Sequence, residues 1–279
     1  MIRFAIRSLF ILLMLCVVKI DLSVANEPPR RIVSLAPSIT EILFELGLED
    51  RIVGVTSYCD YPEEAKKKPK IGGMSNPSIE AVLRLKPDIV VMTTGGNPKA
   101  FAERLKSVGI KIYVFTAKRL SELPKGVREL GAALGVTEKA DRFATDYESA
   151  LAGFRSKHLK TGMDKRKVLF VVWPNPLIVA GPDSVMDDAI TLVGGKNIAA
   201  GARAEYPKFS IEEIIKRWPD TIFIGSGKGM EEGVQGLLGR LRNVPAVMQK
   251  RIFYVGDDLY RLGPRTIRGI QDISRAMEE

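Results

Sequence analysis

The sequence SIEAVLRLKPDIVV at residues 78–91 recurs 132 positions later, in modified form, as SIEEIIKRWPDTIFI at residues 210–224. Serine, isoleucine, glutamate, proline and aspartate hold the same places in both copies. In each copy a serine suited to an N-cap precedes a short helical pattern. A proline then ends that pattern ahead of an apolar run typical of a buried strand. The repetition predicts a chain built as two similar halves, each containing this helix and this strand.

Helices and strands alternate around both copies. The predicted strands are 32–35, 52–56, 89–92 and 112–115 in the first half, and 167–173, 221–225 and 252–255 in the second. The predicted helices are 38–46, 78–85 and 98–108, then 183–193, 210–217 and 264–277. A capping box, Ser38 to Glu41, is expected to open the first helix. Such alternation favours parallel pairing through right-handed crossovers. The predicted fold class is therefore α/β, with two similar lobes, each a parallel-type sheet flanked by helices.

A helical pattern without proline separates the two halves at residues 137–160. Its apolar positions recur at helical spacing: Ala140, Phe143, Ala144, Tyr147, Leu151 and Phe154. A helix of this length would run about 35 Å, which is enough to join two lobes stiffly. We therefore expect an N-terminal lobe at 26–136, a linker helix at 137–160 and a C-terminal lobe at 161–279.

The N-terminus has the pattern of a secretory signal peptide over residues 1–25. Arg3 and Arg7 precede an apolar run at 9–18, and small residues lead up to a predicted cleavage site after Ala25. The run is too short for a membrane span, which needs roughly 20 residues. Cys16 raises the alternative of a lipoprotein, but bulky residues precede it where a lipobox needs small ones. Soluble export to the periplasm is the favoured interpretation.

Charge and composition exclude several classes of function. Removing residues 1–25 takes away three basic residues and one acid, so the formal charge falls from +9 to +7. The basic residues are scattered, which argues against a nucleic-acid or anionic-membrane partner. Cys59 is the only cysteine and His158 the only histidine beyond residue 25. No catalytic triad, cysteine–histidine pair or histidine metal cluster is present in the sequence, so neither an enzyme nor a metal site is expected.

Ligands of such folds bind beyond the carboxyl ends of the strands. The segments that follow the predicted strands are 56–61, 72–76, 93–97, 173–176, 206–209 and 256–265. They are rich in glycine, proline, aromatic and amide residues and contain few charges. This composition favours a bulky ligand that is uncharged or weakly charged.

Longer motifs extend the pattern: RIVSLAPSITEILFELG, VGVTSYCDYPEEA, LVGGKNIAA and GDDLYRLGPR. Together with the repeated helix they resemble the helical-backbone periplasmic solute-binding proteins of ABC importers, a family of receptors for iron siderophores, haem and cobalamin. SYCDYP and the GGN at 95–97 are most similar to the cobalamin-binding members. The resemblance implies a monomeric receptor without catalysis or a cofactor of its own. Its partners would be a permease dimer and the associated ATPase, and its ligand a corrinoid.

The resemblance also implies roles for individual residues. Glu80 and Glu212 match the glutamates that dock into arginine pockets of the two permease subunits. Both also lie near a helix N-terminus, where a carboxylate is favourable by about 0.3–1 kcal/mol whatever its other role. The expected ligand-binding residues are Tyr58, Gly73, Met74, Gly96, Asn97, Trp173, Tyr206, Asp257 and Arg261. Met74 stands where the cobalamin receptors would have a tryptophan, and for Trp173 a place in the core is as well supported as one in the cleft.

Other ligands and functions remain open at this point. Haem would need an axial ligand, for which Tyr58 or Tyr206 could serve. An anionic ferric siderophore would need cleft arginines, for which Arg261 and Arg265 are candidates. A tetrapyrrole chelatase would also have two α/β lobes, but it would need a histidine with an acid, and His158 lies among lysines. A bare scaffold protein would leave the aromatic strand-end segments unexplained.

Overall fold

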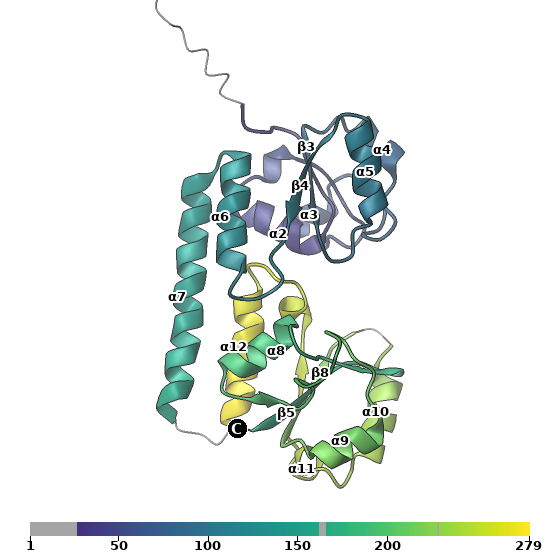
Figure 1. Ribbon diagram of the computed structural model, residues 1–279, viewed down its shortest axis with the longest axis vertical. Coiled ribbons are helices and arrows are strands. Elements are labelled where there is room, and N and C mark those ends of the chain that lie inside the picture. The colour runs from purple at the N-terminus through teal and green to yellow at the C-terminus, as the bar shows by residue number, and fades with distance from the viewer. Residues whose placement is uncertain (1–26, 162–165, 228) are drawn as a thin grey trace, which may run out of the picture.

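The computed structural model describes residues 27–161, 166–227 and 229–279. Two α/β lobes lie one above the other in Figure 1, and a long helix runs along one side of the molecule beside them. The predicted fold class is confirmed. The signal peptide predicted at 1–25, and Cys16 within it, lie outside the described residues.

The N-terminal lobe contains a four-stranded parallel sheet in the order β2-β1-β3-β4. Its strands are β1 (Ile32–Ser34), β2 (Ile52–Val55), β3 (Ile89–Thr93) and β4 (Lys111–Phe115). Its helices are α2 (Pro37–Glu45), η1 (Glu49–Arg51), α3 (Glu63–Lys66), α4 (Ile79–Arg84), α5 (Lys99–Ser107) and α6 (Leu123–Leu134). Strands β1 and β3 are almost wholly buried, as expected of central strands in a parallel sheet.

The C-terminal lobe contains a five-stranded sheet in which β6-β5-β8-β9 are successive neighbours and β7 also pairs with β5. Its strands are β5 (Lys167–Pro174), β6 (Leu177–Val179), β7 (Lys196–Asn197), β8 (Thr221–Gly225) and β9 (Ile252–Val255). Its helices are α8 (Val185–Leu192), α9 (Ile211–Arg217), α10 (Glu231–Arg240), α11 (Pro245–Met248), η2 (Asp257–Leu259) and α12 (Thr266–Glu278). The pairing is parallel except for β6, which turns back antiparallel on β5.

Helix α7 (Thr137–Thr161) connects the lobes and packs against α6, α8 and α12. The apolar stripe predicted from the sequence faces this packing. Ala140, Ala144 and Tyr147 are buried, and Phe143 and Tyr147 stack with ring centroids 5.8 Å apart. Because elements of both lobes contact one helix, the lobes share a continuous apolar core along it.

The serines of the two repeated segments have the same role. Ser78 Oγ accepts a hydrogen bond from the backbone N–H of Ala81 at 3.2 Å, and Ser210 Oγ accepts one from Glu213 at 3.1 Å. Each serine therefore caps its helix as predicted, satisfying one of the N–H groups that a helix N-terminus leaves without a partner.

The aspartates of the repeat also act alike. Asp88 Oδ2 accepts hydrogen bonds from the backbone N–H groups of Arg30 at 2.8 Å and Arg31 at 2.9 Å, just before β1. Asp220 Oδ2 accepts one from Lys167 at 2.8 Å, at the start of β5. Each aspartate thus attaches the beginning of its strand to the neighbouring strand of its own sheet.

The capping box predicted from Ser38 to Glu41 is wrong. Helix α2 begins one residue earlier, at Pro37, and its N-cap is Ala36, which makes no side-chain cap. Ser38 consequently lies inside the first turn. The Glu41 carboxylate turns into the protein, where the ion cluster described below holds it. The bounds of the other predicted helices agree with the structure to within about two residues.

Candidate functional site

Several large aromatic side chains are exposed on segments that follow strands or lie between them, and three of these are Tyr58, Trp173 and Tyr206. Tyr58 follows β2 and is 62% exposed, Trp173 lies near the end of β5 and is 39% exposed, and Tyr206 precedes α9 and is 43% exposed. Exposed aromatic groups of this size commonly mark binding surfaces, because burial is otherwise their favoured state. All three belong to the residues expected to bind ligand.

In the N-terminal lobe the structure brings the predicted residues together. A Cβ on Gly96, which has a φ of 94°, would lie 2.1 Å from the Met74 methyl carbon, so Met74 packs directly over this glycine. A Cβ on Gly73 would lie 3.5 Å from the Tyr58 ring. The two glycines therefore let one surface form between Tyr58 and Met74.

Asn97 supports that surface from below and does not project from it. Its side chain is buried, and its Oδ1 accepts a hydrogen bond from the backbone N–H of Thr93 at 2.8 Å. Its Nδ2 donates to the carbonyls of Leu35 and Met74, each at 2.9 Å. The hydrogen bonds of the amide are thus made to the backbone, where they hold the segments around Leu35, Met74 and Thr93 in place.

In the C-terminal lobe, Tyr260 is a residue that sequence reasoning missed. Its ring packs edge-on to Phe170 with centroids 6.1 Å apart. A Cβ on Gly225, at the end of β8, would lie 1.6 Å from its hydroxyl. Burial and the nearby Asp257 raise the pKa of Tyr260, so its phenol stays neutral. The signal in the sequence was the glycine ending TIFIG, which marks a close approach to the backbone.

Arg261 joins the two lobes. Its guanidinium donates to both oxygens of Asp60, at 2.5 and 3.3 Å, and to Glu41 Oε1 at 3.2 Å. Asp257 lies 4.0 Å away on the same C-terminal segment. The Arg261 side chain is 18% exposed, whereas those of Asp60 and Asp257 are more than half exposed. The hydrogen bond from Arg261 lowers the pKa of Asp60.

Arg265 extends the same cluster. Its Nε and Nη2 donate to Glu41 at 2.9 and 2.7 Å, and its Nη1 donates to Asp258 at 2.6 Å. Its guanidinium also lies 4.3 Å from the centroid of the Tyr61 ring, within cation–π range. The Glu41 side chain is only 1% exposed, so this carboxylate is compensated inside the protein by arginines from the other lobe.

A second ion cluster connects the lobes nearer to α7. Arg119 lies between β4 and α6 and donates to both Asp188 oxygens, with Nε–Oδ2 at 2.8 Å. It also contacts Asp183, and the backbone N–H of Leu120 donates to Asp188 at 3.0 Å. Asp188 belongs to α8 of the C-terminal lobe. No local pattern in the sequence pairs residues this far apart, and sequence reasoning missed the cluster.

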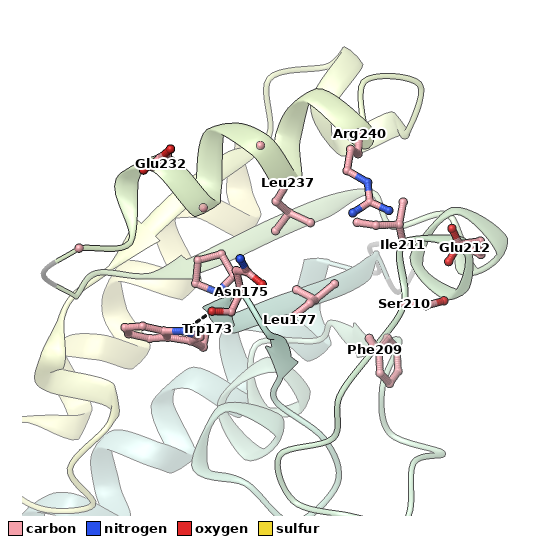
Figure 2. A pocket seen from close by; sticks show the side chains of 14 residues that line it. Trp173, Asn175, Leu177, Phe209, Ser210, Ile211, Glu212, Glu232, Leu237 and Arg240 are labelled. Carbon is pink, nitrogen blue, oxygen red and sulfur yellow. Dashed lines mark hydrogen bonds between the residues drawn. The ribbon is translucent and has the colours of Figure 1, made fainter.

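Trp173 and Glu212 line one groove of about 780 Å³ on the C-terminal lobe. Figure 2 shows the groove between α10, the turn after β5 and the start of α9, with Trp173 and Glu212 towards opposite sides of the view. The Trp173 indole N–H donates to the Asn175 carbonyl at 2.8 Å. Trp173 is therefore a surface residue of the lobe and not part of its core.

The two repeated glutamates are exposed in both lobes. A hydrogen bond from its own backbone N–H and another from the serine hydroxyl lower the pKa of each carboxyl. Arginines lie nearby in both cases: Arg84 and Arg104 beside Glu80, and Arg240 beside Glu212. Both glutamates are consequently ionised at neutral pH and point to the surface.

Two residues outside the predicted site are more enclosed than a surface position would be. Cys59 is buried, and its sulfur lies 3.1 Å from the hydroxyls of Thr40 and Thr56. His158, which lies among lysines in the sequence, is half-buried against Ser274 of α12, with Nε2 to Oγ at 3.1 Å. Within the described residues no group of three or more His, Cys, Asp or Glu side chains could hold a metal ion. None of the helices described is long and apolar enough to span a bilayer.

Two similar α/β lobes on one long connecting helix, with exposed aromatic side chains at strand ends, define a class of binding proteins. A sequence profile of the periplasmic binding protein family matches residues 32–259. The chain therefore belongs to the periplasmic binding protein family. Members of this family bind substrates for transport and are not enzymes.

Three proteins illustrate how similar this chain is to characterised and uncharacterised relatives. The vitamin B12-binding protein of Vibrio parahaemolyticus serotype O3:K6 is 29% identical over 260 residues, covering 92% of this chain and 93% of the relative. YvrC of Bacillus subtilis, an uncharacterised ABC transporter substrate-binding lipoprotein, is 34% identical over 268 residues, covering 92% and 82%. Among solved structures, the apo form of the periplasmic haem-binding protein RhuT from Roseiflexus sp. RS-1 is 34% identical. Its TM-score is 0.79, with coverage of 88% of this chain and 97% of that one.

Proposed function

We propose that this protein is a periplasmic receptor that captures cobalamin or a related corrinoid between its lobes and delivers it to an ABC importer. The observation that carries the proposal is the set of exposed aromatic side chains Tyr58, Trp173 and Tyr206, contributed by segments of both lobes. A corrin is a large flat ligand, and aromatic faces bind such ligands through extensive apolar contact. The name of the Vibrio relative supports the same ligand.

The ion cluster favours a ligand without strong negative charge. Arg261 and Arg265, the arginines that an anionic siderophore would use, are both engaged by carboxylates of the protein. Asp257 remains a candidate for a polar contact because its side chain is 59% exposed. Gly73, Met74 and Gly96 would form the apolar wall on the N-terminal side, and Asn97 would hold that wall in place.

Haem is the second candidate. Two observations favour it: the exposed Tyr58 phenol could serve as an axial iron ligand, and the 34% identical structural relative is a haem-binding protein. The two ligands would contact different parts of Tyr58. A corrin would pack against its ring, whereas haem iron would be coordinated by its phenol oxygen.

Calorimetric titration of the exported chain, residues 26–279, with cyanocobalamin and with haemin tests the proposal. We expect one-to-one binding of cyanocobalamin. Tyr58→Phe should leave that affinity within about twofold, and Tyr58→Ala should weaken it roughly tenfold through loss of ring contact. Binding of haemin alone, abolished equally by both variants, would overturn the corrinoid proposal in favour of haem.

Glu80 and Glu212 are proposed to dock the receptor onto the two halves of a permease dimer, as two like sites on a symmetric partner require. The double variant Glu80→Arg/Glu212→Arg should abolish cobalamin uptake in the native host and leave calorimetric binding intact. Glu64→Arg/Asp272→Arg makes the same charge change at other exposed acids and serves as the control. Normal uptake by the docking double variant would refute this role.

Export is part of the proposal. Cleavage after Ala25 would release a soluble periplasmic chain that acts as a monomer. Mass spectrometry of the secreted protein tests this directly. A mass matching residues 26–279 is expected, and a diacylglycerol adduct on Cys16 would show lipidation in its place.

A further inference from the structure

The side chain of Arg261 is enclosed by carboxylates on the side that faces solvent. Asp60 binds it through both oxygens, and Asp257 lies 4.0 Å away. The side chains of these two acids are 54% and 59% exposed, whereas that of Arg261 is 18% exposed. A ligand approaching from solvent would therefore meet the two carboxylates before it met the guanidinium.

The cluster as a whole carries more acid than base. Its arginines are Arg261, Arg265 and Arg268, and its acids are Glu41, Asp60, Asp257 and Asp258. One negative charge is thus left over beside the surface that carries Tyr58. Such a surface repels carboxylates and leaves neutral ligands unaffected.

We propose that Asp60 is a specificity-determining residue, which holds Arg261 and so makes the site select ligands without net negative charge over polycarboxylate ligands. This inference rests on the proposed function and names the chemical basis of its selectivity. Asp60 lies two positions after Tyr58 on the same strand-end segment, while Arg261 comes from the other lobe. The pairing therefore forms only where the two lobes meet, which is where the ligand is proposed to bind.

Asp60→Asn tests the inference because it removes one charge and keeps the shape of the side chain. The readout is the ratio of the haemin Kd to the cyanocobalamin Kd, since haemin carries two propionates and cyanocobalamin is neutral overall. We expect this ratio to fall about three- to tenfold, or haemin binding to become measurable where the wild type shows none. The gain should shrink in about 1 M salt, because screening weakens an exposed charge contact.

Asp272→Asn on α12 is the matched control. It removes the same charge from an exposed acid that pairs with Arg275, outside the cluster. The inference would be overturned if Asp60→Asn changed the ratio of Kd values less than twofold, or if Asp272→Asn changed it equally. It would also be overturned if the gain in haemin binding did not depend on the salt concentration. A wild type that binds haemin more tightly than cyanocobalamin would overturn it as well.

A second measurement needs no ligand and so separates this inference from the proposed function. Phenylglyoxal modifies accessible guanidinium groups, and peptide mass spectrometry reads the rate at each arginine. Asp60→Asn should speed modification of Arg261 several-fold and leave Arg265 unchanged, because Arg265 retains Glu41 and Asp258. If the wild type bound neither tetrapyrrole, the proposed function would fail, and equal Arg261 rates in wild type and variant would separately refute the role of Asp60.

Discussion

Replacement of Glu41 by glutamine tests how strongly the cross-lobe ion cluster stabilises the protein. The Glu41 side chain is 1% exposed and accepts hydrogen bonds from Arg265 at 2.7 and 2.9 Å and from Arg261 at 3.2 Å. Glutamine has nearly the same shape, so the packing of α2 is retained. What changes is the negative charge that compensates two enclosed guanidinium groups.

The expected loss of stability follows from what remains after the substitution. Breaking a buried ion pair by removing one partner costs about 3–5 kcal/mol. Here the cost is smaller, because Arg265 keeps Asp258 and Arg261 keeps Asp60. The glutamine carbonyl can also still accept one hydrogen bond. We therefore expect Glu41→Gln to lower the free energy of unfolding by about 2–3 kcal/mol.

Urea unfolding followed by circular dichroism measures this difference. Glu45→Gln is the matched control, since Glu45 is exposed one turn further along the same helix. The control should change the free energy of unfolding by less than about 0.5 kcal/mol. If Glu41→Gln behaved like the control, the cluster would contribute nothing measurable and the cross-lobe argument would be refuted.

Three further predictions each concern one residue. Burial lowers the pKa of His158 from its ordinary 6.5, so its contribution to stability is present above about pH 6.5 and is lost as the pH falls towards the folded-state pKa. As the only histidine, it should give one NMR titration with a midpoint below 6.5, and a midpoint at or above 6.5 would contradict its burial. Asn97→Ala should cost about 2–4 kcal/mol in urea unfolding, because three backbone groups lose a partner. Gly225→Ala should displace Tyr260 and weaken ligand binding in calorimetry, whereas unchanged affinity would exclude Tyr260 from the site.

The repeated segment made the overall architecture predictable. Each copy contains a helix start, a helix end and a buried strand within fifteen residues or fewer, and these are local signals. The apolar stripe of α7 was equally visible, because its buried positions recur at helical spacing. What such signals cannot give is the antiparallel turn of β6 onto β5, since pairing direction depends on the surrounding sheet.

Helix α6 was not among the predicted elements, and it contains two glycines, which have a low helix propensity. The structure gives these glycines a packing role. A Cβ on Gly131 would lie 2.2 Å from the Cβ of Ala140 on α7, and one on Gly126 would lie 3.1 Å from the Phe115 ring. The low helix propensity of these glycines is thus compensated by the close contact that they allow with α7 and β4. These contacts involve residues outside the helix, so the sequence of α6 alone does not indicate them.

The positions of the candidate site residues were predictable in part, but their contacts were not. Tyr58 and Arg261 were proposed because they follow strands β2 and β9, and parallel sheets bring such segments to one edge; that they bind ligand stays a prediction. Arg261 is held by Asp60, more than two hundred residues away in sequence, and no local pattern indicates such a pair. Glu41 was predicted to be part of a capping box, since a serine three residues before a glutamate looks the same whether the carboxylate turns to the helix or into an ion cluster.

Glu80 and Glu212 differ from the other residues that the two copies of the repeat share. Serine caps a helix in both copies, isoleucine and proline are buried in both, and aspartate fixes a strand start in both. Glutamate alone faces solvent twice. Stabilising the helix N-terminus accounts for a carboxylate in the first turn but not for its position, because the next first-turn position is Ala81 in one copy and Glu213 in the other. A carboxylate meets the helix dipole at either position, so the dipole alone does not fix the position of the acid, and we propose that Glu80 and Glu212 are kept by a partner that contacts both lobes in the same way.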